Sequence, residues 1–118
     1  MPHLISLSAA IALTSNYKKQ KGNLLASTLQ GANVLPDCET FDRDAFDALL
    51  KQEGCTRVRI YFGMDEKNMV RLVIVGVDAN DNDIVPQQTR TLEEDTSVII
   101  EDGLRCPEMC PPSSPLNS

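Results

Sequence analysis

The stretch that decides the fold is residues 57–77, RVRIYFGMDEKNMVRLVIVGV. In its first part apolar and polar side chains alternate, with Val58, Ile60 and Phe62 on one side, and this period of two is typical of a half-buried strand. After a polar turn, the residues from Val70 to Val77 are apolar on nearly both faces, as in a central strand. The sequence therefore predicts an antiparallel hairpin in which Val58, Ile60 and Phe62 face the core.

A first helix is predicted on the N-terminal side of this hairpin. Ser6 or Ser8 can cap its start, because a serine hydroxyl accepts a free backbone N–H of the first turn. Apolar residues then recur at helical spacing. Lysines follow in the last turn, where cations oppose the negative end of the helix dipole, and Gly22 is a natural stop.

A second helix is predicted between Asp42 and Gly54. Asp42 is a good N-cap residue, and Phe41 before it can pack on Phe46 one turn into the helix. A glycine just past the last turn is a common helix end. The buried stripe of this helix is predicted to consist of Phe46, Leu49 and Leu50.

Beyond the hairpin, a short third strand is predicted at Ile84-Val85, before Pro86, which suits a sheet edge. Residues 92–103 leave two alternatives open. Thr91 with Glu94 matches a capping box and favours a helix, whereas Val98-Ile99-Ile100 favours a strand.

These elements predict an α+β fold, with two helices packed on a small antiparallel sheet of two to four strands. At 118 residues the chain is long enough for one domain with its own core. From Cys106 onward the composition changes, because four of the seven prolines follow that residue. We therefore expect a single α+β domain over residues 1–105 and an irregular Cys/Pro-rich C-terminal tail over residues 106–118.

The charge balance argues against nucleic acid as a partner. The chain has 17 acidic and 11 basic residues, a formal net charge of −6, which repels phosphate groups and anionic membranes. No stretch approaches the roughly 18 apolar residues of a membrane span. The apolar segment 4–13 lacks the preceding lysines or arginines of a signal peptide. We therefore expect a soluble, acidic, cytoplasmic protein with no membrane partner.

Cysteine is the most informative residue type of this chain. The C-x3-C spacing of Cys106 and Cys110 fits half of a zinc site, and it also fits an intramolecular disulfide. Cys38 and Cys55 flank the second predicted helix, do not complete a common metal pattern, and suit small buried positions. Cys106 and Cys110 are therefore the candidate redox residues and the candidate metal ligands, and no cofactor is expected.

Residues 78–83, DANDND, have the alternating oxygen ligands of a calcium loop. The pattern departs from that motif at two places, because Asp83 stands where glycine is needed and Thr89 where a bidentate glutamate is needed. Asn and Asp also tolerate left-handed backbone, so a plain hairpin turn is favoured.

Other candidate residues also have simpler structural interpretations. Arg57, Arg59 and Tyr61 share a strand face that could contact a phosphate and stack a base, but in an acidic chain an ordinary exposed face is favoured. Acidic side chains near predicted helix starts stabilise the helix dipole; these are Asp42, Asp44, Asp47, Glu93, Glu94 and Asp95. His3, the single histidine, lies near a chain end and makes a poor catalytic base.

Five segments together carry a resemblance: ISLSAAIAL, CETFD, GCTRVRIYFGMD, VIVGVDANDND and RCPEMCPPSSPLN. As a set, spread over most of the chain, they resemble a group of short uncharacterised proteins from Bacteroidetes-type bacteria. The resemblance implies a bacterial origin. None of the segments is a catalytic signature, so the resemblance implies no activity.

The sequence identifies no activity, and it lacks a nucleophile, base and acid set as well as a glycine-rich phosphate loop. We therefore lean away from an enzyme and towards a small non-catalytic binding or protein-interaction module. Its partner is expected to be a protein or a second copy in a homodimer, because a small sheet tends to leave an edge or an apolar face uncovered. The alternative is a thiol-based redox or metal-binding protein that uses Cys106 and Cys110.

Overall fold

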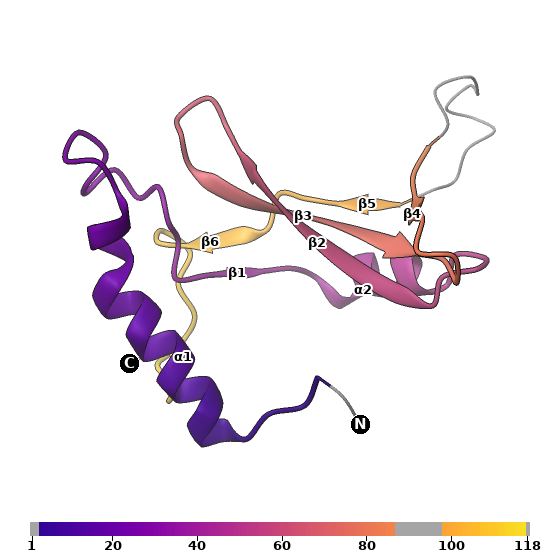
Figure 1. The fold of residues 1–118 in the computed structure, drawn as a ribbon, viewed down its shortest axis with the longest axis horizontal. Coiled ribbons are helices and arrows are strands. Elements are labelled where there is room, and N and C mark those ends of the chain that lie inside the picture. Colours follow the sequence, from indigo (N-terminus) through magenta and orange to yellow (C-terminus); the bar gives the residue numbers. More distant parts are fainter. Residues whose placement is uncertain (1–2, 87–97, 118) are drawn as a thin grey trace. The chain divides into compact units, whose positions relative to one another are not determined.

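The computed structural model describes residues 3–86 and 98–117, and its helices and antiparallel strands confirm the α+β class (Figure 1). The chain divides into two compact units, one formed by residues 1–39 with 104–118 and the other by residues 40–103. The predicted boundary after residue 105 lies inside strand β6 (Leu104–Cys106). Residues 104–118 thus belong to the same unit as the N-terminal segment.

The first unit contains helix α1 (Leu7–Gln20), which continues into a 3-10 turn, η1 (Lys21–Leu24). Ser6 is its cap, because the Ser6 hydroxyl accepts the backbone N–H of Ala9 at 3.1 Å. Later in the same helix the hydroxyl of Tyr17 donates to the carbonyl of Pro36 at 2.7 Å. Just beyond it, Lys21 pairs with Asp37 at 2.7 Å, so the segment before β1 is held against the helix.

Strand β1 (Cys38–Thr40) pairs with β6 in a two-stranded sheet. Arg105 of β6 is buried, and its guanidinium donates to the carbonyl oxygens of Asn33 at 3.0 Å and Val34 at 3.4 Å. Its Nε also lies 3.7 Å from a carboxylate oxygen of Glu39. Charge pairing therefore compensates the burial of this cation.

The second unit is built on the predicted hairpin of β2 (Arg57–Met64) and β3 (Val70–Val77). The antiparallel register runs from Arg57 opposite Val77 to Met64 opposite Val70, which confirms the prediction. On its other side β3 pairs with two short strands, β4 (Asp83–Ile84) and β5 (Ile99–Ile100). Within the described residues, β2 is therefore an edge strand with a single neighbour.

The two short strands, β4 and β5, bear on the predictions made for Ile84-Val85 and for residues 92–103. The third strand, predicted at Ile84-Val85, is β4 and starts one residue earlier. For residues 92–103 the strand alternative is confirmed at Ile99–Ile100. The capping box of Thr91 and Glu94 lies outside the described residues, as do Glu93, Asp95 and Thr89.

Helix α2 (Arg43–Leu50) packs against this sheet. Phe41 and Phe46 meet edge to face with ring centroids 6.0 Å apart, as the predicted staple requires. Leu49 is fully buried and forms the core with Ile74 and Ile100. The predicted stripe is wrong at Leu50, which is 54% exposed, because Phe46 and Leu49 pack on the core whereas Leu50 points away from it.

The predicted buried face of β2 is also wrong. Val58, Ile60 and Phe62 are 40%, 50% and 79% exposed. Ile60 lies opposite the buried Ile74, so these side chains do share the face that α2 covers. At eight residues, however, α2 is short, and the core cluster that it forms includes side chains of β3 and β5 but none of β2.

Candidate functional site

Within the part of the chain that the structure describes, the backbone of β2 presents free hydrogen-bonding groups along its outer edge. At the hairpin end, the N–H of Asp65 donates to the carbonyl of Met69 at 3.0 Å. In an antiparallel ladder every second residue bonds to the partner strand. Counting back from Asp65, the odd-numbered residues bond to β3. The N–H and C=O groups that point away from β3 therefore belong to Val58, Ile60, Phe62 and Met64.

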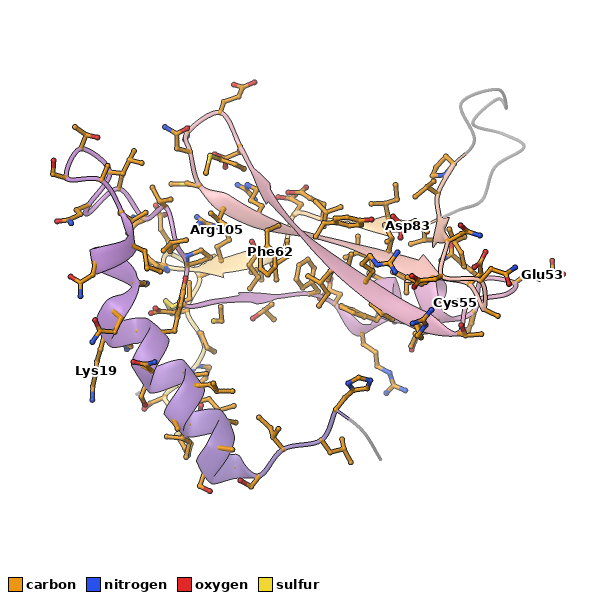
Figure 2. All side chains as sticks on the ribbon, viewed as in Figure 1. Lys19, Glu53, Cys55, Phe62, Asp83 and Arg105 are labelled. Atoms are coloured by element: carbon orange, nitrogen blue, oxygen red, sulfur yellow. A yellow bond between two sulfur atoms is a disulfide. The ribbon has the colours of Figure 1, made fainter. Side chains whose placement is uncertain are left out.

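The same four residues carry exposed apolar side chains, and they share one face of the sheet because alternate residues of a strand point the same way. Figure 2 labels Phe62, the most exposed of the four. Met64, at the end of the row, is 62% exposed. Edge strands of soluble proteins are usually protected by prolines, bulges or charges that hinder a further strand. In β2, no proline or charge interrupts the row from Val58 to Met64 on this face. The edge therefore offers backbone groups and apolar surface together.

The opposite face of β2 is polar, and its charges are already paired within the unit. Arg59 contacts Asp81 at 2.6 Å and Asp83 at 2.5 Å, and Arg57 contacts Asp81 at 2.8 Å. The hydroxyl of Tyr61 donates to the carboxylate of Asp83, the acid labelled in Figure 2. The phosphate-contacting role considered for these arginines is thus opposed by internal ion pairs as well as by the net charge.

Hydrogen bonding sets the proton affinities on this polar face. The hydrogen bond from Tyr61, and then the one from Arg59, hold the pKa of Asp83 below its usual range. The same bond to Asp83 raises the pKa of Tyr61, because removing the phenolic proton would place two negative oxygens side by side. At neutral pH, Asp83 is therefore charged and Tyr61 neutral.

Residues 78–83 form a turn between β3 and β4, as the plain-turn interpretation predicts. The carboxylate of Asp78 accepts the backbone N–H groups of Asn80 and Asn82, each at 2.9 Å. Asp81 and Asp83 point to the arginines of β2. The oxygens that a calcium loop would need are thus engaged in the turn and its ion pairs.

Cys106 and Cys110 are brought together and form a disulfide. Cys106 lies in β6 and is only 7% exposed, whereas Cys110 is exposed. Cys38 and Cys55 are free thiols and half-buried. Across residues 3–86 and 98–117, no three His, Cys, Asp or Glu side chains are grouped to hold a metal ion.

Three of the acidic residues predicted near helix starts lie at α2. Asp42 is the N-cap residue, Asp44 lies in the first turn, and Asp47 pairs with Arg43 at 3.5 Å. His3 is exposed. These positions fit solvated acids near a helix start rather than an acid and base pair.

The first unit contains a cavity of about 440 Å³ with a mostly apolar lining that includes Leu13, Pro111 and Leu116. Its polar side chains have partners: Lys18 donates to the carbonyl of Asn117 at 3.0 Å, and Asp37 pairs with Lys21. The cavity is thus a small apolar recess.

The chain matches no protein-family model, no curated protein and no solved structure. Among the residues that the structure describes, no helix is both long enough and apolar enough to cross a membrane. Sequence reasoning missed the exposed face of β2. The available signal was the short distance between Asp42 and Gly54, since a helix that fits between them is at most about 17 Å long and is too short to cover the whole hairpin.

Proposed function

We propose that this protein is a non-catalytic protein-interaction module that binds an extended protein segment along strand β2. One observation carries the proposal: Val58, Ile60, Phe62 and Met64 combine outward-pointing backbone groups with exposed apolar side chains. A strand added at this edge would form main-chain hydrogen bonds and cover those side chains at the same time.

The physical gain comes from two sources. The backbone groups at the β2 edge would exchange hydrogen bonds to water for hydrogen bonds to the bound strand, and these bonds fix the direction and register of that strand. Burial of the apolar side chains supplies the larger favourable term, at roughly 25 cal/mol for each Å² removed from water. Contiguous apolar surface of this kind on a small protein marks a binding site more often than scattered single residues do.

Peptides displayed on phage provide a direct test with the full chain as bait. Selected peptides should bind the wild type and lose at least tenfold in affinity on Phe62→Lys, which places a charge in the apolar row. Ile60→Pro should act similarly, because it removes one outward N–H while the β3 ladder keeps its bonds. Leu50→Lys, at an exposed position of α2, is the matched control. Equal binding by all variants would contradict the proposal.

A thiol-based role is the second candidate, and the Cys106–Cys110 disulfide supports it. Cys110 is the exposed partner of the disulfide, so its sulfur is the one that we expect a thiolate of an external dithiol to attack. That attack would form a mixed disulfide and release Cys106 as thiolate, and the second thiol of the reductant would then free Cys110. Metal binding at the same pair requires this reduced state.

Replacement of the two cysteines separates the two candidate functions. Cys106→Ser with Cys110→Ser should leave peptide binding at β2 unchanged if the module function is right. A thiol protein would instead lose its exchange with a dithiol such as reduced thioredoxin, a loss measured by the rate of thiol release.

A further inference from the structure

We infer that the segment bound by β2 is β2 of a second copy of this chain, paired antiparallel about a two-fold axis that passes beside Tyr61. The inference rests on the proposed function and names its partner. Two four-stranded sheets would then join into one continuous sheet across the dimer.

The parity of the strand limits the registers that are open to such a pair. Directly opposite residues of an antiparallel pair have their side chains on the same face of the sheet. Their backbone N–H and C=O groups either both point towards the partner strand or both point away from it. Even-numbered residues of β2 must therefore face even-numbered residues of the second copy. Only a few registers meet this condition and still overlap most of the strand.

One of these registers pairs the whole apolar row with itself. Val58 lies opposite Met64 of the second copy, and Ile60 lies opposite Phe62, each pair occurring twice by symmetry. If the two-fold axis passed beside residue 60, Met64 would lie opposite the polar Thr56. If it passed beside residue 62, Val58 would lie opposite Glu66. The register centred on Tyr61 is therefore the one that buries all four apolar side chains against apolar partners.

Charge complementarity favours the same register on the opposite face. Arg57 faces Asp65 of the second copy at each end of the ladder, so opposite charges rather than like charges meet there while Arg57 keeps Asp81 and Asp65 keeps Arg71 within each copy. Arg59 faces Gly63, which leaves room for the arginine and its bonds to Asp81 and Asp83. No arginine lies directly opposite another arginine, and Arg71, which lies across from Gly63 in β3, is already paired with Asp65.

Cysteine cross-linking tests the register. Tyr61 would face its own copy at a non-hydrogen-bonded position, where Cα atoms lie about 4.5 Å apart, within disulfide range. Oxidised Tyr61→Cys protein should therefore become a covalent dimer, joined through the introduced cysteines in a peptide map. Arg59→Cys or Gly63→Cys alone should not cross-link, because each position lies about 13 Å from its own copy, whereas a mixture of the two should. Gly63 has room for a side chain, since an added Cβ would meet its nearest atoms at 3.6 Å.

Sedimentation equilibrium of the full chain supplies the second measurement. The wild type should dimerise, and Ile60→Lys should raise the dimer dissociation constant at least tenfold while its circular dichroism stays native. A wild type that remains monomeric at high micromolar concentration overturns the inference, as does cross-linking in another register. If such a monomer still binds displayed peptides through β2, the proposed function stands without the homodimer. If it binds neither, both are wrong.

Discussion

The carboxylate of Asp65 accepts a hydrogen bond from Nε of Arg71 at 2.8 Å and closes the turn of the central hairpin. Its other oxygen accepts the backbone N–H groups of Lys67 and Met69 at 2.9 and 3.0 Å. The bond from Arg71 first, and the backbone bonds after it, hold the pKa of Asp65 below its usual range. The turn that positions β2 is thus stabilised by an ionised side chain.

The hairpin should therefore show a defined acid sensitivity. A carboxyl group with a depressed pKa in the folded state stabilises fully above its unfolded pKa, near 3.9 for Asp, and loses this effect as pH falls through the lower folded value. Asp65→Asn should lower the urea midpoint at pH 7, and the difference from wild type should shrink at pH 3. Glu66→Gln, exposed in the same turn, is the control. A difference independent of pH would contradict this role.

Adjacent leucines of α2 should differ sharply in their effect on stability. Leu49→Ala removes a fully buried side chain from the core and should cost about 2–5 kcal/mol in free energy of unfolding. Leu50→Ala, at a mostly exposed position, should cost less than about 1 kcal/mol. Urea denaturation of the two variants checks the difference. Similar losses would mean that the helix presents another face to the sheet.

The titration of Tyr61 should depend on Asp83. Because the hydrogen bond to Asp83 raises the pKa of Tyr61, Asp83→Asn should move its titration down towards the ordinary value near 10. Ultraviolet titration in a Tyr17→Phe background isolates this phenol, since the chain has two tyrosines. Asp81→Asn removes a partner of Arg57 and Arg59 that does not bond to Tyr61, and it should shift the titration less. An equal shift would refute the assigned hydrogen bond.

The thiol count should change with reduction. In the oxidised chain only Cys38 and Cys55 carry thiols, so denatured protein should yield two titratable groups before reduction and four after it. Cys110→Ser should give three groups under both conditions. Four groups in unreduced wild type would show that Cys106 and Cys110 remain thiols.

Local chemistry explains why the helices and the hairpin could be predicted from the sequence. The cap at Ser6, the Phe41 and Phe46 staple, and the polar turn after β2 each depend on residues close in sequence. The same holds for the turn at Asp78, whose carboxylate bonds to backbone groups within four residues. Such contacts form wherever the local sequence allows them, whatever the rest of the chain does.

The amino-acid sequence by itself determined the α+β class, the antiparallel hairpin and the alternation of its two faces. It did not determine which apolar residues are covered, because alternation divides a strand into faces without specifying what packs on each face. Only the tertiary structure showed that α2 buries Leu49 against Ile74 and leaves Phe62 exposed. It also decided that residues 104–106 pair with residues 38–40, a contact between distant segments that no local pattern encodes. The candidate site arises from that uneven coverage of one sheet face, which depends on the length and position of a helix rather than on the strand's own residues.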